Sequence, residues 1–171
     1  VTRHFAGPEG ESVVDMSEAA SRGAIEMAGI DPEQIGCIIV ATVSHPYQTP
    51  AAAPLLAVRI GADTAAAFDI SAACAGYCHG ITLASDMVRA GTVEYALVVG
   101  VERLSDFTDP TDRGTAFIFA DGAGAAVVGP SESEGIGPTI WGSDGTHWDA
   151  ICQRDSWIDV REQDLGWPAI V

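Results

Sequence analysis

The stretch that decides the fold of this chain is residues 68–77, Phe68-Asp69-Ile70-Ser71-Ala72-Ala73-Cys74-Ala75-Gly76-Tyr77. An apolar run ends at Ile70 and small residues follow as far as Gly76, which predicts a strand, a tight turn at Cys74 and then a helix. The turn needs small neighbours because the cysteine must project into a cleft. The first turn of a helix also offers free amides and partial positive charge, which favour a thiolate. The pattern therefore indicates a nucleophilic Cys74.

Two other interpretations of Cys74 compete with this one. A structural, buried cysteine fits the local pattern equally well. A metal site built from Cys74, Cys78 and His79 is disfavoured, because His79 points about 100° away from Cys78 on an ideal helix. A structural zinc also needs four ligands, so we expect no metal. The general base that would activate Cys74 is not identified among the candidates His4, His45, His79 and His147.

Outward from this stretch, helical and strand-like segments alternate. We expect helices at about 15–29, from Pro50 to near Gly61, and from about Cys74 to Gly91, and Asp15 followed by Glu18 resembles a capping box. The expected strands are 35–42, 66–70, 95–100, 115–120, 125–128 and 136–141. Alternating elements predict an α/β layer with helices on both faces of the sheet. We expect one domain over 1–171, with an irregular loop or tail at 145–171.

Composition excludes several classes of function. The net charge is −16 and all eight basic residues are arginine, which argues against a nucleic-acid surface. A solvated acidic surface is the simpler interpretation, with recruitment of a basic partner as the alternative. No apolar run approaches the roughly 20 residues of a membrane helix, and no secretion signal is evident. Four cysteines without paired spacing favour a reduced, cytoplasmic setting.

The segment Gly122-Ala123-Gly124 resembles the start of a dinucleotide-binding loop. However, Val127 stands where a third small residue is needed, and the chain continues as a strand and not as a helix. We expect a glycine-rich hairpin or close backbone packing here.

With these motifs in view, the chain resembles the β-ketoacyl-acyl-carrier-protein synthase III family and its relatives that prime polyketide synthesis. The matching segments are 66–76 (AAFDISAACAG), 97–102 (LVVGVE), 109–115 (DPTDRGT) and 121–126 (DGAGAA). The resemblance implies a thiolase-like α/β fold, with helices layered around a mixed five-stranded sheet, of which this chain is the N-terminal half. It also implies that Cys74 takes an acyl group from acyl-CoA as a thioester. Malonyl-acyl-carrier protein would then lose its carboxylate, and its carbanion would attack the thioester to start fatty-acid synthesis. A homodimer is implied, and no cofactor beyond the CoA thioester substrate.

The resemblance assigns CoA-binding residues. Arg113 matches an arginine that stacks on the CoA adenine, as a planar guanidinium can, and Gly114 of the same motif belongs with the substrate-binding residues. The alternative for Arg113 is a surface salt bridge with Asp109 or Asp112.

The resemblance also assigns an acyl pocket. Leu104 and Phe119 match positions that line it, with plain core packing as the alternative. Thr49 matches the position that reaches across the dimer to cap the partner's pocket. Because some family members carry a large aromatic there, the smaller Thr49 is expected to leave room for branched or longer acyl groups.

The departures from the family limit these expectations. Members are about twice as long, and the missing half carries the histidine and asparagine that drive decarboxylation and the basic patch that docks the carrier protein. The family's first strand, which this chain lacks, is expected to lie inside the sheet. Its absence would therefore leave a gap in the hydrogen-bond ladder between the remaining strands. Unless the missing pieces are supplied elsewhere, the chain alone is therefore expected neither to condense nor to fold stably. The alternatives are a priming ketosynthase of an aromatic polyketide pathway, which the sequence does not separate from the fatty-acid enzyme, and a non-catalytic thiolase-fold partner.

Overall fold

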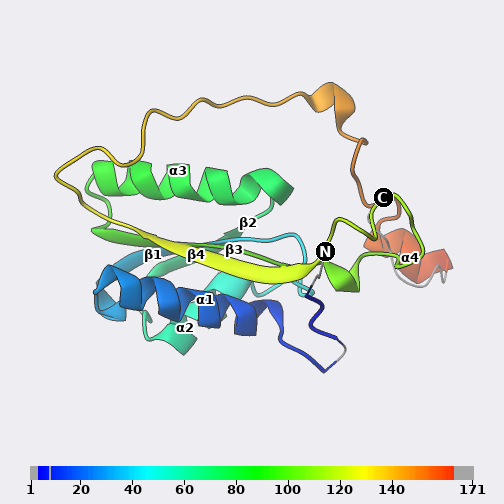
Figure 1. The fold of residues 1–171 in the computed structure, drawn as a ribbon, viewed down its shortest axis with the longest axis horizontal. Helices are drawn as coiled ribbons and strands as arrows, with labels where there is room; N and C mark the ends of the chain where they lie inside the picture. The colour runs from blue at the N-terminus through cyan, green and yellow to red at the C-terminus, as the bar shows by residue number, and fades with distance from the viewer. Residues whose placement is uncertain (1–3, 8, 164–171) are drawn as a thin grey trace.

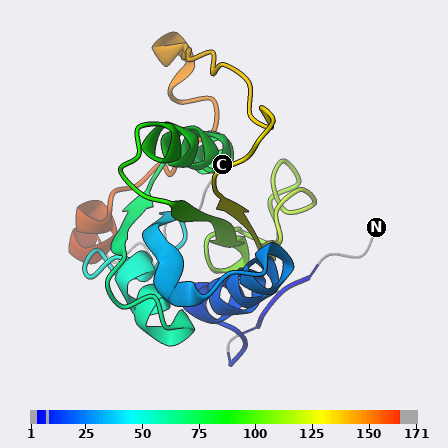
Figure 2. The same cartoon turned by 90° about the vertical axis from the view of Figure 1, so that its left-hand side faces the viewer.

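A mixed sheet lies at the centre of the computed structural model, which describes residues 4–7 and 9–163 (Figure 1). Its strands are β1 (Ile35–Ala41), β2 (Ala66–Ile70), β3 (Tyr95–Arg103) and β4 (Asp121–Val128), in the order β2-β1-β3-β4. The strand β1 is parallel to β2 and β3, whereas β4 is antiparallel to β3. Helices α1 (Val13–Ala28) and α2 (Ala52–Ile60) cover one face, and α3 (Gly76–Arg89) covers the other (Figures 1 and 2).

Apolar side chains from the strands fill both faces of the sheet. Successive side chains of β1 alternate between the faces, so Ile38 and Val40 pack toward α1 and α2 while Cys37 and Ile39 pack toward α3. All four are essentially inaccessible to solvent. Each fully buried branched side chain contributes about 1.5–3 kcal/mol. A strand covered on both faces has a continuous apolar sequence, which is why β1 and β3 are recognisable without alternation.

The first helix begins earlier than the sequence pattern suggests. Ser12 is its N-cap: its hydroxyl accepts from the Asp15 amide at 3.1 Å, and the Asp15 carboxylate accepts from the Ser12 amide at 2.9 Å. Asp15 is therefore the third helical residue of a capping box, and the expected pairing of Asp15 with Glu18 is wrong. Gly29 ends the helix in the left-handed region, with φ of 65°, where glycine carries no Cβ penalty.

Two segments that were expected to be strands are not. Residues 115–120 form hydrogen-bonded turns, because Asp112 and Thr115 accept from backbone amides two to four residues ahead. Residues 136–141 are irregular and run along the outer side of α3 without a neighbouring strand (Figure 1). Side chains hold them there, with Trp141 stacked on His79 and Thr139 bonded to Thr82.

Between residues 145 and 163 the structure has a 3₁₀ turn, Gly145–His147, and a short α-helix, where the sequence shows no convincing element. Helix α4 (Trp157–Gln163) follows Ser156, whose hydroxyl accepts from the Asp159 amide at 3.1 Å. The rest of the expected tail, residues 164–171, lies outside the described residues. No helix within 4–7 and 9–163 is both long and apolar enough to cross a membrane.

The sheet has no internal gap. Strands β1 and β3 are direct neighbours, with Ile38 opposite Leu97 and Val40 opposite Val99. The expectation of a broken ladder is therefore wrong, because the two strands bond to each other and β4 occupies the edge. The described residues hold four strands, whereas the resemblance implies five.

Candidate active site

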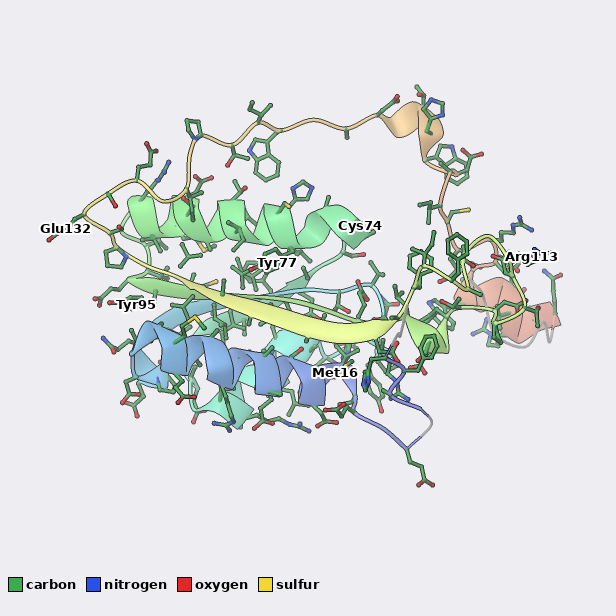
Figure 3. The ribbon with its side chains drawn as sticks, in the orientation of Figure 1. Met16, Cys74, Tyr77, Tyr95, Arg113 and Glu132 are labelled. Atoms are coloured by element: carbon green, nitrogen blue, oxygen red, sulfur yellow. The ribbon has the colours of Figure 1, made fainter. Side chains whose placement is uncertain are left out.

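Cys74 lies in a short 3₁₀ turn, Ala73–Ala75, between the end of β2 and the first turn of α3 (Figure 3). Its side chain is exposed, so the structural, buried alternative is wrong. The preceding residue, Ala73, has φ of 44°, in the left-handed region that costs a non-glycine residue about 1–2 kcal/mol. Strained backbone of this kind is typical of a turn that presents a nucleophile.

Two glycines let α3 approach the sheet closely behind Cys74. A Cβ added to Gly76 would lie 3.1 Å from the Cβ of Ala41, at the end of β1. A Cβ added to Gly80 would lie 2.8 Å from Cγ1 of Val98, in β3. Larger side chains at either position would lift the helix, so these glycines set the height of Cys74 above the strands.

Cys74 lines a hollow of about 420 Å³ at the ends of β1 and β3 and the start of β4. The other lining residues are mostly small: Ala41, Ala73, Tyr77, Gly100, Val101, Glu102, Ala120, Asp121, Gly122, Ala123 and Gly124. The glycine-rich segment 122–124 is part of β4 and pairs with β3, with Gly122 opposite Glu102 and Gly124 opposite Gly100. It is a paired strand and one wall of the hollow, but a Cβ added to Gly122 or Gly124 would meet no atom within 4 Å, so the expected close packing is wrong at these two glycines.

Glu102 is a half-buried carboxylate in this hollow. It accepts hydrogen bonds from the Val43 amide at 3.0 and 3.2 Å, from the Thr42 hydroxyl at 3.3 Å and from the Ser44 hydroxyl. Ser44 in turn accepts from the Arg103 amide at 2.7 Å. Burial raises the pKa of Glu102, and these hydrogen bonds only partly oppose that shift. Glu102 thus joins the end of β3 to the loop that follows β1.

Asp121 fixes the opposite wall. Its carboxylate accepts from the Ser105 amide at 2.9 Å, the Ser105 hydroxyl at 2.7 Å and the Ala6 amide at 2.7 Å. Burial raises the pKa of Asp121, but the bonds from Ser105 and Ala6 together with the charge of Arg103 outweigh it and hold the pKa below its usual value. The start of β4 is therefore tied to the residues that follow β3.

Arg113 lies away from Cys74 (Figure 3), and both Arg113 and the adjacent Gly114 are exposed in a turn. Arg113 lines a second hollow of about 550 Å³ that includes Phe5, Ser105, Thr108 and Phe117. Across residues 4–7 and 9–163 no salt bridge joins Arg113 to Asp109 or Asp112, because those carboxylates accept from Thr111 and from Gly114 and Thr115 instead. The salt-bridge alternative for Arg113 is therefore not realised.

The three residues assigned to the acyl pocket lie outside the hollow that Cys74 lines. Leu104, in the turn after β3, and Phe119 are half-buried, and Thr49 is exposed in the loop between β1 and α2. Sequence reasoning missed two residues that do share the hollow, Tyr77 and Glu102. Tyr77 follows Cys74 by about one helical turn, a spacing that places both on one face. The signal for Glu102 is a lone acid directly after the apolar run of β3.

In the part of the chain that the structure describes, none of the four histidines lines the hollow at Cys74. His79 stacks on Trp141 with ring centroids 4.9 Å apart, His45 Nε2 lies 3.3 Å from the Pro50 carbonyl, and neither lines the hollow. His4 and His147 lie 3.6 and 4.0 Å from acidic side chains elsewhere on the surface. No base for Cys74 is found among them. Within the described residues no three His, Cys, Asp or Glu side chains are placed to hold a metal ion.

Comparison with known proteins gives a consistent answer. The family model for 3-oxoacyl-[acyl-carrier-protein] synthase III matches residues 68–145. The chain is 58% identical to β-ketoacyl-[acyl-carrier-protein] synthase III 1 of Streptomyces coelicolor over 165 residues, which are 96% of this chain and 48% of that protein. Among solved structures, the priming β-ketosynthase of the R1128 polyketide pathway is 45% identical with a TM-score of 0.94 and coverage of 99% and 51%. The synthase III of Pseudomonas aeruginosa PAO1 is 34% identical with a TM-score of 0.87 and coverage of 99% and 52%.

The chain thus spans about half the length of the relatives it matches. Its mixed sheet, covered by helices on both faces, is thiolase-like, as the sequence predicts. The matched region includes the β2–turn–α3 unit with Cys74 and the β3–β4 pair that forms the other side of the hollow. Over 96% of its length the chain is thus similar to β-ketoacyl-[acyl-carrier-protein] synthase III proteins, and the family model for these enzymes matches its residues 68–145.

Proposed function

We propose that the protein is an acyltransferase in which Cys74 carries an acyl group as a thioester. The observation that supports this most is the position of Cys74, exposed in a strained turn before α3 and open to a hollow. The Cys74 sulfur attacks the carbonyl carbon of an acyl-CoA. A C–S bond to Cys74 forms, the C–S bond to CoA breaks, and CoA leaves as the thiol after taking up the proton released by Cys74.

The backbone around Cys74 suits this step. The Cys74 N–H belongs to the turn that leads into α3, where helix amides and their dipole point toward negative charge. It is our candidate donor to the oxygen that becomes negative during the attack. Loss of one such donor typically costs about 2.7–4 kcal/mol of transition-state stabilisation.

The second half of the proposed reaction follows from the resemblance to this family. Malonyl-acyl-carrier protein loses CO₂, and its carbanion attacks the Cys74 thioester. A C–C bond forms, the Cys74 C–S bond breaks, and a β-ketoacyl-carrier protein leaves as the first product of fatty-acid synthesis. In this proposal the protein works as a cytoplasmic homodimer and takes acyl-CoA as substrate with no further cofactor.

The remaining substrate contacts have unequal support. Arg113 and Gly114 are proposed to bind CoA, and the hollow beside Arg113 is consistent with that role. Leu104, Phe119 and Thr49 enter as acyl-pocket residues from the resemblance alone, because none of them lines the hollow at Cys74.

A second candidate function is the priming of polyketide synthesis. It is favoured by the similarity to the R1128 priming β-ketosynthase, which covers 99% of this chain with a TM-score of 0.94. The chemistry at Cys74 is the same in both candidates, so they differ in the carrier protein and the starter acyl group. Comparing product formation with a fatty-acid carrier protein and a polyketide carrier protein separates them.

The test of the proposed function is direct acylation. After incubation with acetyl-CoA or isobutyryl-CoA, mass spectrometry should find one acyl group per chain, mapped to Cys74, with release of an equal amount of CoA. Cys74→Ala should remove the adduct. Cys78→Ala is the matched control, because Cys78 is also exposed and one helical turn away, and it should leave the adduct in place. An acyl group on Cys78, or none on the chain, would contradict the proposal.

A further inference from the structure

We propose that the ring of Tyr77, seated on Gly100, is a wall of the Cys74 hollow that limits the length and branching of the acyl groups accepted next to Cys74. This inference rests on the proposed function and names its specificity element. The substrates concerned are acyl thioesters that differ in the length or branching of the acyl chain.

The composition of the hollow singles out Tyr77. Most of the lining is alanine and glycine, which have no side chain that could limit an acyl group. Glu102 and Asp121 are larger, but their carboxylates are held by hydrogen bonds to Thr42–Ser44 and to Ser105 and Ala6. Tyr77 is therefore the large apolar surface that faces the open space, and 37% of it is exposed.

A close contact fixes the ring. Tyr77 lies between α3 and the sheet (Figure 3), and its ring occupies the space above Gly100 of β3. A Cβ added to Gly100 would lie 3.1 Å from Cδ2 of Tyr77 and 3.5 Å from its Cβ and Cγ. Gly100 is bound on both sides, opposite Ala41 of β1 and Gly124 of β4, so the strand cannot yield. A methyl group at position 100 would instead push the ring off the sheet and into the hollow.

Tyr77 and Gly100 are the two sides of one contact, and substitutions at these two positions should have opposite effects on which acyl groups are accepted. Tyr77→Ala removes the wall and enlarges the space next to Cys74. Gly100→Ala keeps the wall and moves it inward. In the double variant the methyl group at position 100 has no ring to displace, so its effect should vanish and the selectivity should follow that of Tyr77→Ala.

The experiment measures the rate at which Cys74 is acylated by acetyl-CoA, isobutyryl-CoA and hexanoyl-CoA, read by intact mass. Tyr77→Ala should raise the hexanoyl-to-acetyl rate ratio by about tenfold, since each methylene in an apolar pocket discriminates about 10-fold or more. Gly100→Ala should lower the same ratio, and the double variant should match Tyr77→Ala. Tyr77→Phe is the matched control, because it keeps the ring and should leave the ratio unchanged.

The outcomes separate this inference from the proposed function. If the unmodified protein forms no adduct at Cys74, the proposed function fails. If Cys74 is acylated but Tyr77→Ala and Gly100→Ala leave the ratio within twofold of the unmodified protein, the inference about Tyr77 is overturned. Should Gly100→Ala fail to fold by near-ultraviolet circular dichroism, Tyr77→Trp takes its place, and its larger ring should lower the ratio.

Discussion

Glu102 shows how much a single side chain can organise in this site. Its carboxylate accepts from Thr42, Val43 and Ser44, residues 58 to 60 positions earlier in the chain. The ends of β1 and β3 therefore meet through one acid at the rim of the Cys74 hollow. The arrangement has an energetic cost, because burial disfavours the ionised form and raises the pKa of Glu102.

This cost gives Glu102 a distinct pH signature. An acid whose pKa is higher in the folded than in the unfolded protein binds its proton more tightly when folded, so its contribution to stability rises as the pH falls from neutral toward about 4.5. Glu102→Gln should remove that contribution. In urea unfolding at pH 7, 6 and 5, the unmodified protein should gain free energy of unfolding relative to Glu102→Gln as the pH falls toward 5.

The control for Glu102 is Glu132→Gln, the same chemical change at an exposed acid that points into solvent (Figure 3). As the pH is lowered, the free energy of unfolding of the unmodified protein should show no comparable gain relative to that of Glu132→Gln. Identical pH profiles for the two variants would mean that Glu102 is not held in a costly environment.

At the residue scale, the features that sequence could predict are local ones. The Cys74 turn follows from a strand, a run of small residues and a helix that are contiguous in the chain. That Tyr77 lies on the same side of the helix as Cys74 could be predicted from the helical spacing of the two residues. Glu102 could be singled out only as an acid after an apolar run, because nothing in its own neighbourhood shows that β1 ends beside it. The same holds for Asp121, which is bound by Ser105 and Ala6 from two different segments.

At the scale of elements, α2 depends on a residue that is not part of it. Ala51 precedes the helix and has no side chain that can cap it. The Asp69 carboxylate, on β2, accepts instead from the Ala52 amide at 2.7 Å and from the Ala53 amide at 2.9 Å. A carboxylate at this end also complements the helix dipole. Asp69 thereby joins α2 to the strand that leads to Cys74.

Removing this cap should destabilise the protein. Replacing an N-cap acceptor by alanine costs about 0.5–2 kcal/mol, and we expect Asp69→Ala to fall in the upper half of that range because two amides lose their partner. Asp69→Asn keeps one acceptor oxygen and should cost less. Urea midpoints report both. Asp63→Ala, at an exposed aspartate of the preceding loop, should have little effect, and an equal loss in Asp63→Ala and Asp69→Ala would contradict the capping role.

The elements predicted correctly are those with strong periodicity or continuous apolar runs, such as β1, β3 and α3. The two false strands, 115–120 and 136–141, are short apolar runs with no such support. In the first, Asp112 and Thr115 bond nearby backbone and favour turns. In the second, the run borders α3 and has no strand to pair with. Pairing partners are a property of the whole sheet, and a local pattern carries no information about them.

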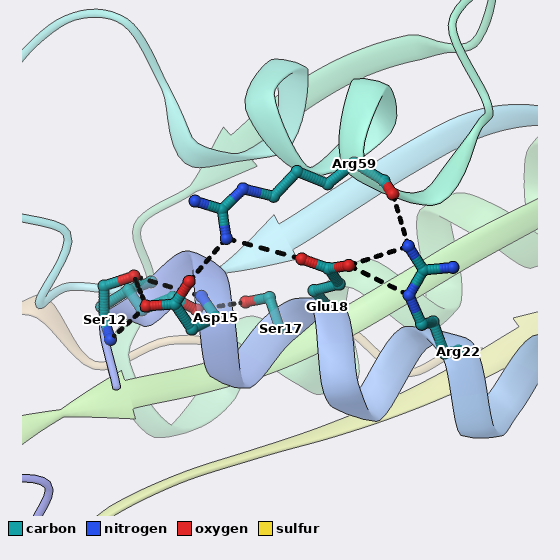
Figure 4. A network of polar contacts seen from close by, with 7 residues as sticks. Ser12, Asp15, Ser17, Glu18, Arg22 and Arg59 are labelled. Atoms are coloured by element: carbon teal, nitrogen blue, oxygen red, sulfur yellow. Dashed lines mark hydrogen bonds and ion pairs between the residues drawn. The ribbon is translucent and has the colours of Figure 1, made fainter. Parts of the chain in front are cut away.

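At the scale of the whole molecule, a charge network joins the two helices on one face of the sheet (Figure 4). Arg59 of α2 donates to Asp15 of α1 at 2.5 Å and to Glu18 at 3.4 Å. Arg22 donates to Glu18 at 2.8 Å and to the Arg59 carbonyl at 2.6 Å. In a chain of net charge −16, such contacts place scarce arginines beside acids that would otherwise repel each other.

Asp15 makes this network sensitive to acid. Hydrogen bonds from the Ser12 hydroxyl, Arg59 and the Ser12 amide lower its pKa from 3.8 to about 2. Because the folded pKa lies below the unfolded one, the stabilisation is complete above about pH 4 and is lost as the pH falls through 3.8 toward 2. The side chain is 45% exposed, so solvent screening limits the contribution to about 1 kcal/mol.

Asp15→Asn should therefore unfold more readily than the unmodified protein at pH 5 to 7, and the difference between them should shrink as the pH is lowered to 2. Other acids with lowered pKa, such as Asp109 and Asp121, also lose stabilisation in this range, but they are common to both proteins and cancel in the difference. Chemical unfolding followed by circular dichroism measures it. Glu26→Gln, at an exposed acid of the same helix, should give a difference near zero at every pH. A difference for Asp15→Asn that stays constant from pH 5 to 2 would show that the network acts through packing of Arg59 and not through the charge of Asp15.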